Sequence, residues 1–279
     1  MLTVLLSIAT STLFGVADFL GGVASRRESA FAVTATAHTV GVIVFGAAVL
    51  LWPAAWSTVD VYAGVAAGVA GGAGVVALYA ALARGRMSVV APITAALSGA
   101  LPALYDFASG TVPGPLGLLG LGLALTAVVI VSMSGDEDER LAMPASAIAL
   151  SVAAGAGFAG SFISLSFSGA HSGFAPLLAA RVTSSALLAL VTFATLRRVF
   201  VEKGVRRSAA AAGLLDAAAN VTMIAAIRIG PLWMASAIGS LYPVVTILLA
   251  RFVLHERLRG LQRAGVLLAL VAVVLTALR

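Results

Sequence analysis

Ionisable residues inside long apolar stretches are the first sign of chemistry in this sequence. Asp18, His38, Arg181 and Asp216 each lie well inside a run of apolar residues that is long enough for a membrane helix. A charge near the middle of such a helix costs about 2.5–3.5 kcal/mol unless it faces a partner or a cavity. Each of the four is therefore a candidate for binding a solute or a proton.

The depths of these residues predict two pairs. Arg181 could reach Asp216, and Asn220 follows one turn later on the same helix face as Asp216. His38 could reach Asp18, and such a pair is a credible proton carrier because both groups can titrate near neutral pH when partly buried. A structural ion pair that pins two helices, and a neutral histidine bonded to backbone or serine, are the open alternatives.

Small and polar residues extend the candidate site along two helices. Asp18 shares a helix face with Ser11, Gly15 and Gly22, and a similar face in a later run carries Gly157, Ser161, Ser164 and Ser168. These faces are expected to line a cavity or to pack closely against neighbouring helices.

Tyrosines and prolines mark further positions. Tyr242 stands beside Pro243 inside a run and is expected to line the cavity, whereas Tyr79 is expected in an interfacial belt and Asp106 in solvent. Pro92 and Pro243 are expected to kink their helices, because proline lacks the backbone N–H.

Several chemistries are excluded by composition. The chain has no cysteine and three histidines that are far apart in sequence, so we expect no metal site. It has one lysine, Lys203, and no phosphate-binding GxxxxGK[ST] loop, so ATP hydrolysis is not expected. No cofactor is predicted, and an intramembrane enzyme is a remote alternative that rests on Asp18 and Asp216 alone.

The remaining composition is that of an all-α integral membrane protein. Hydrophobic residues make up 61% of the 279 and charged residues 10%. The runs predict ten transmembrane helices at about 2–23, 31–51, 60–83, 87–107, 114–133, 144–168, 174–196, 208–228, 233–254 and 260–278.

The second half of the sequence echoes the first. A shift of 145 residues places Gly85 on Gly230 and Phe107 on Phe252. We predict one five-helix repeat over residues 1–133, an acidic linker over 134–143 and a second repeat over 144–279. Because five is odd, the second repeat must enter the membrane upside down, which is typical of secondary transporters with a site between the halves.

The basic residues predict the orientation. Thirteen follow odd-numbered spans, whereas only Arg228 and Arg279 follow even-numbered ones. The thirteen are Arg26, Arg27, Arg84, Arg86, Arg140, Arg197, Arg198, Lys203, Arg206, Arg207, Arg257, Arg259 and Arg263. The positive-inside rule then puts the odd loops in the cytoplasm and both termini outside. The net charge of +6 is accounted for in this way, and no nucleic-acid partner is expected.

Three stretches resemble the drug/metabolite transporter superfamily in its ten-span form with two EamA-like repeats. They are LFGVADFLGGVASRR (13–27), GLLDAAANVTMIAAIRIGPL (213–232) and SLYPVVTILLARFVLHERL (240–258). The second repeat is the clearer match, since Thr111 and Ser98 stand where the repeat would place a glutamate and Pro243.

The resemblance implies secondary active transport, by export or exchange, of a small organic metabolite, amino acid or drug. Transport would proceed by alternating access in the cell (plasma or inner) membrane, with protons as a candidate coupling ion. The expected partners are the small-molecule substrate and membrane lipid. A monomer is adequate for ten spans, and a dimer is compatible. A passive channel or a lipid flippase is the alternative.

Overall fold

A computed structural model describes the chain except residues 86, 133–143, 254–259 and 278–279. Within this part every regular element is a helix. The helices are α1 (Leu2–Ser25), α2 (Ala30–Leu51), α3 (Thr58–Arg84), α4 (Met87–Ala108), α5 (Pro115–Ser132), α7 (Ala145–Ser166), α8 (Ala175–Leu196), α9 (Lys203–Ile229), α10 (Leu232–Gly239), α11 (Tyr242–Val253) and α12 (Gly260–Ala277).

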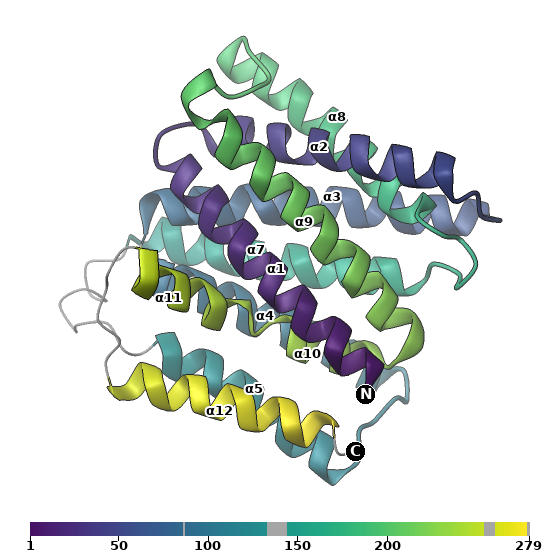
Figure 1. The fold of residues 1–279 in the computed structure, drawn as a ribbon, viewed down its shortest axis with the longest axis vertical. Coiled ribbons are helices and arrows are strands. Elements are labelled where there is room, and N and C mark those ends of the chain that lie inside the picture. Colours follow the sequence, from purple (N-terminus) through teal and green to yellow (C-terminus); the bar gives the residue numbers. More distant parts are fainter. Residues whose placement is uncertain (86, 133–143, 254–259, 278–279) are drawn as a thin grey trace.

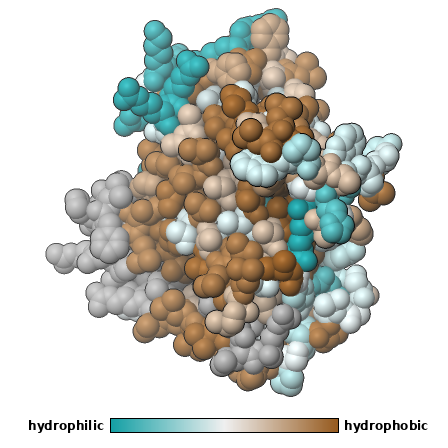
Figure 2. All heavy atoms as spheres, turned by 45° about the vertical axis from the view of Figure 1, so that its right-hand side comes forward, coloured by the Kyte–Doolittle hydropathy of each residue, from teal (hydrophilic) through white to brown (hydrophobic). Residues whose placement is uncertain are grey.

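The helices form a membrane-spanning bundle. Among the described residues, seven helices are long and apolar enough to cross a bilayer, and shorter apolar helices include α10 and parts of α5 and α11. The start of α1 and the end of α12 lie at the same end of the bundle (Figure 1). Hydrophobic residues cover most of the middle of the face seen in Figure 2, and hydrophilic residues gather at its upper edge.

Basic residues gather at the end of the bundle opposite to the start of α1. Arg26 and Arg27 follow α1, Arg84 ends α3, and Arg197 and Arg198 follow α8. The ends of α1 and α3 lie on the left of Figure 1, and the end of α8 lies at its top. We call this the basic end and the other the N-terminal end.

The contacts between helices come in matched pairs. To see this, each helix of the first half is exchanged with its counterpart in the second: α1 with α7, α2 with α8, α3 with α9, α4 with the α10–α11 pair, and α5 with α12. The largest interfaces are α3 with α7 and α1 with α9, which exchange with each other. Likewise, α3 on α8 exchanges with α2 on α9, and α4 on α7 exchanges with α1 on α10 and α11. The pairs α2–α8 and α5–α12 each join the same helix of the two halves. The contacts thus follow an approximate two-fold relation.

Glycines let α3 approach α8 closely. A Cβ on Gly68 would collide with the backbone oxygen of Ala180, and one on Gly72 would lie 2.8 Å from the Cβ of Ser184. Gly64 meets Pro176 in the same way. The spacing of four residues puts these glycines on one face of α3, which defines the α3–α8 seam.

The ninth predicted span is not continuous. Residues 233–254 were expected to form one helix, but α10 ends at Gly239 and α11 begins at Tyr242, with a turn at Ser240 and Leu241 between them. Pro243 explains the break, because it has no N–H to donate to the carbonyl of Gly239 one turn earlier. A discontinuous helix inside a membrane bundle is tolerated where protein surrounds it.

Two sequence predictions about polar residues were wrong. Tyr79 is not in an interfacial belt but is buried at 2% exposure, because Gly21 of α1 leaves room for its ring. Asp106 is not solvated: it is 8% exposed and accepts a hydrogen bond of 2.8 Å from the backbone N–H of Trp233. Asp106 therefore caps the start of α10, where helix N–H groups lack partners.

Two stretches from the sequence analysis lie outside the described residues. They are the whole of the acidic linker (134–143) and the end of the third resembling stretch (254–258).

Candidate functional site

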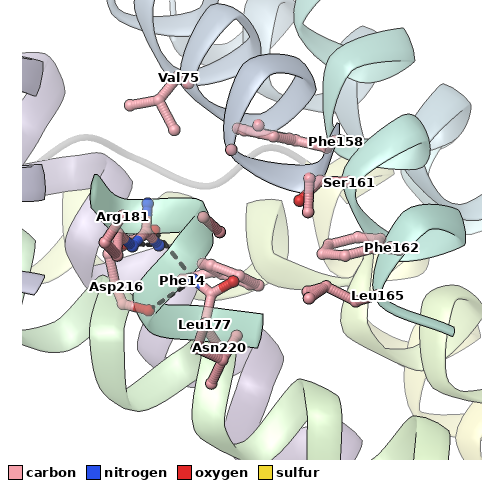
Figure 3. Close-up of a pocket in the computed structure, with 15 residues that line it drawn as sticks. Phe14, Val75, Phe158, Ser161, Phe162, Leu165, Leu177, Arg181, Asp216 and Asn220 are labelled. Carbon is pink, nitrogen blue, oxygen red and sulfur yellow. Dashed lines mark hydrogen bonds and ion pairs between the residues drawn. The ribbon is translucent and has the colours of Figure 1, made fainter. Parts of the chain in front are cut away.

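A small cavity lies between α8 and α9 on one side and α7 on the other. Arg181, Asp216 and Asn220 form one wall, and Figure 3 shows them facing a row of side chains on α7. That row consists of Phe158, Ser161, Phe162 and Leu165. The space open to water-sized molecules is about 30 Å³, which holds about two waters.

Arg181 and Asp216 form an ion pair at the centre of this site. The Nη2 group of Arg181 donates to Oδ2 of Asp216, and the two side chains are 9% and 14% exposed. Asn220 Nδ2 donates to the backbone oxygen of Asp216 at 2.8 Å and lies 3.4 Å from Oδ1. The sequence placed these three residues at compatible depths, and the fold brings them together.

The stem of Arg181 crosses the surface of α2 to reach Asp216. It passes over Gly41, where a Cβ would lie 2.9 Å from Cδ and 3.1 Å from Cγ of Arg181. Any larger residue at position 41 would compete with the arginine for this space. Gly41 is thus a positioning residue for the ion pair.

His38 joins the same cluster. Its Nε2 lies 2.9 Å from Nη1 of Arg181, and its Nδ1 lies 2.8 Å from Oγ of Ser184. A guanidinium can only donate, so Nε2 must be the acceptor and Nδ1 must carry the proton. His38 is therefore neutral in this arrangement, which matches one of the alternatives that the sequence left open.

The predicted pair of His38 with Asp18 is absent from the described part of the chain. His38 faces α8, where Arg181 and Ser184 use both ring nitrogens, and this leaves no nitrogen for Asp18. The prediction failed because depth in the membrane fixes only one of the three coordinates of a side chain. The direction in which α2 faces was not accessible from its sequence, since α2 is apolar nearly all round.

Asp18 lies in a second, separate space of about 20 Å³ with Ser98 and Tyr242. The residue is 7% exposed, and within the described residues its carboxylate has no hydrogen-bond or ion-pair partner. Three phenylalanines separate this space from the Arg181–Asp216 cavity because they line both: Phe14, Phe158 and Phe162. The bundle thus holds a paired and an unpaired carboxylate on two sides of one aromatic wall.

Tyr242 and the two prolines lie around the helix break. Tyr242 lines the space of Asp18, and its hydroxyl donates to the backbone oxygen of Ala91 at 3.3 Å. Pro243 is buried in the first turn of α11, whereas α4 continues as one helix through Pro92. The unpaired carboxylate therefore lies beside the interrupted helix.

Side-chain bonds tie the two halves together at the basic end. Arg198 donates to Oε2 of Glu28 at 2.7 Å and to Oε1 of Glu202 at 2.9 Å. The backbone N–H of Glu202 donates to Oε1 of Glu28 at 3.2 Å. These residues join the α1–α2 and α8–α9 connections, and we call them the basic-end clamp.

A matching set of bonds lies at the N-terminal end. The N–H of Gly169 donates to Oδ1 of Asp60 at 2.7 Å, and Arg228 donates to Oγ of Ser172 at 2.7 Å and to the backbone oxygen of Gly173 at 3.0 Å. These bonds join the α7–α8 connection to the start of α3 and to the end of α9. We call them the N-terminal-end clamp. Exchanging the two halves turns the α1–α2 connection of the basic-end clamp into this α7–α8 connection.

Sequence reasoning missed several residues that complete the site. Ser184, Glu28 and the three phenylalanines were not singled out. Ser184 could have been found, because it follows Arg181 by three residues and so lies on the same face of α8. The phenylalanines gave no signal, since aromatic residues at helical spacing are common in any apolar bundle.

Comparison with known proteins agrees with this architecture. An apolar bundle with charged groups buried between its halves is typical of a multi-pass membrane protein. Residues 145–278 match the EamA-like transporter family. The match covers the second half of the chain, and it confirms the predicted resemblance to EamA-like transporters of the drug/metabolite type.

A solved crystal structure shares the fold across the whole chain. It is 17% identical, superposes with a TM-score of 0.75, and the match covers 99% of this chain and 96% of the other. A comparison with curated proteins gives no match.

Proposed function

We propose that the protein is a secondary active transporter that moves a small organic solute across the cell membrane by alternating access. The observation that carries this proposal is the buried Arg181–Asp216 ion pair, which faces a cavity in the middle of the bundle and is joined from behind by His38. Burying such groups is costly, so a fold that keeps them is expected to use them. ATP hydrolysis or other enzymatic activity is not part of the proposal.

The two carboxylates have different roles in this proposal. Asp216 is neutralised by Arg181, so this pair binds a polar or charged part of the solute by exchanging one partner for it. Asp18 has no partner among the described residues, and an unpaired carboxyl in an apolar space favours the protonated form. We assign Asp18 to the coupling proton, with Tyr242 and the helix break beside it.

Alternating access requires the two clamps to open in turn. The basic-end clamp is proposed to face the cytoplasm by the positive-inside rule, which puts both termini outside. The two five-helix halves, residues 1–133 and 144–279, are proposed as inverted repeats that rock about the cavity. One chain supplies every part of this device, so a monomer suffices.

Thermal stabilisation across a solute library tests the proposal. Purified protein is melted at two pH values with metabolites, amino acids and drugs, in parallel with Asp216→Asn and Asp18→Asn. A solute that stabilises the parent but not Asp216→Asn supports a binding site at the ion pair. Stabilisation that is equal in all three proteins would refute it.

Flux measurements then separate a transporter from a channel. In proteoliposomes a carrier shows a saturable rate and counterflow, in which solute on one side accelerates uptake of labelled solute from the other. A rate that stays linear with concentration, without counterflow, would instead indicate a passive channel.

A further inference from the structure

A groove on the outer face of the bundle lies directly behind the charged cavity. It has a volume of about 320 Å³, roughly ten times the 30 Å³ of the cavity. Its lining is apolar apart from one hydroxyl side chain. The residues come from α2, α3, α7 and α8 and include Val69, Ala73, Leu150, Leu187 and Val191.

The groove opens to the membrane rather than to water. Val69, Leu187 and Val191 are 49%, 44% and 39% exposed. In a membrane protein, apolar residues that are this exposed contact lipid chains. Among the described residues that line the groove none is ionisable, so they offer no partner to a charged solute.

Three of the four helices that line the groove have an arginine at the basic end. Arg27 precedes α2, whose Phe31 lines the groove, Arg84 ends α3, and Arg197 follows α8. Val191 and Arg197 are six residues apart, which is about 9 Å along a helix. An apolar groove below a basic rim has the charge pattern that an anionic phospholipid fits.

We propose that this groove binds an acyl chain of an anionic phospholipid from the leaflet at the basic end, with the phosphate held by the arginine rim. Only the α3–α8 seam separates this chain from the charged cavity. Gly68 and Gly72 line both spaces, and Ser184 lines the groove while it bonds to His38. Lipid in the groove would therefore support the wall of the solute site from outside.

Native mass spectrometry of the purified full chain tests the site. The protein is supplied with phosphatidylglycerol or phosphatidylcholine in a mild detergent, and the retained lipid is counted. Leu187→Trp fills the groove. Val182→Trp is the matched control, because Val182 is 48% exposed on the same helix but lies about 140° around it and does not line the groove.

The proposal predicts that the parent and Val182→Trp retain phosphatidylglycerol, that Leu187→Trp loses it, and that phosphatidylcholine is retained less. Arg197→Gln is expected to remove the preference between the two lipids. Equal retention of phosphatidylglycerol by Leu187→Trp and Val182→Trp would overturn the proposal. A dimer of the parent that Leu187→Trp alone dissociates would overturn it too, since the groove would then be an interface between two copies.

Discussion

Arg181 reaches Asp216 across Gly41 of α2, where the lack of a side chain leaves room for the arginine stem. The two charged residues belong to consecutive helices, α8 and α9, that are both packed on α2. The ion pair is therefore an arrangement of three helices rather than two, and α2 controls it without contributing a charge of its own.

Gly41→Ala is predicted to disturb the ion pair without preventing folding. The new Cβ would meet the flexible stem of Arg181, which can move aside, so solute binding should fall while the protein still folds. Gly46→Ala is the control, because nothing lies within 4 Å of a Cβ there. Alanine at position 46 should be neutral or up to about 1 kcal/mol stabilising. Melting curves with and without solute compare the two, and equal solute binding in both would contradict the prediction.

Asp216→Asn is predicted to destabilise the protein by about 3–5 kcal/mol, because it leaves the buried charge of Arg181 without a partner. The double variant Arg181→Gln, Asp216→Asn should recover much of that loss, since no charge then remains unpaired. The double variant should still bind no solute. Melting temperatures of the two single variants and the double variant give the coupling, and additive effects would mean that the pair does not contribute as a unit.

Asp18→Asn is predicted to leave stability unchanged or improved, because the carboxylate of Asp18 has no ion-pair partner in the described part of the chain. It should uncouple transport from protons: solute exchange would persist, while solute-driven proton movement would cease. Proteoliposomes that contain a pH-sensitive dye measure this directly. Proton movement at the parent rate in Asp18→Asn would show that another group carries the proton.

Glu28→Gln is predicted to weaken the basic-end clamp and to expose the cavity at that end. The chain has no cysteine, so Ser161→Cys introduces a single label at the cavity wall. A membrane-impermeant maleimide applied at the basic end should react faster in Glu28→Gln than in the parent background. Arg207→Gln removes a charge from an exposed residue nearby and should leave the rate unchanged. The same acceleration in both variants would point to a general effect of charge.

More of the fold than of the candidate site could be predicted from the sequence. Apolar runs of about twenty residues predict membrane helices almost by length alone, and their order along the chain is the order of the helices. The positions of the arginines in the loops predict the direction in which each helix crosses the membrane. The depths of Arg181 and Asp216 followed from the same count. The position of the break before Pro243 could be predicted, but its nature could not, because a proline in a membrane helix can either kink the helix or interrupt it.

What could not be predicted is which way each helix faces. α2 and α5 have almost no polar side, so their rotation is set by glycine contacts such as that of Gly213 against the backbone of Ala37. Because the rotation of α2 was unknown, His38 was wrongly predicted to pair with Asp18. The cap that Asp106 forms on the start of α10 was hidden for a related reason, since the packing of α4 against α10 does not follow from the sequence.

The tightness of the cavity has a consequence for how the protein should be studied. A space for about two water molecules admits no organic solute, so binding must draw on a rarer, wider conformation. If one molecule in about a hundred is wide at a given moment, the apparent Kd is about a hundredfold weaker than the intrinsic one. Variants with a loosened clamp should then bind solute more tightly although they melt at a lower temperature. Ranking variants by stability alone would discard the best binders.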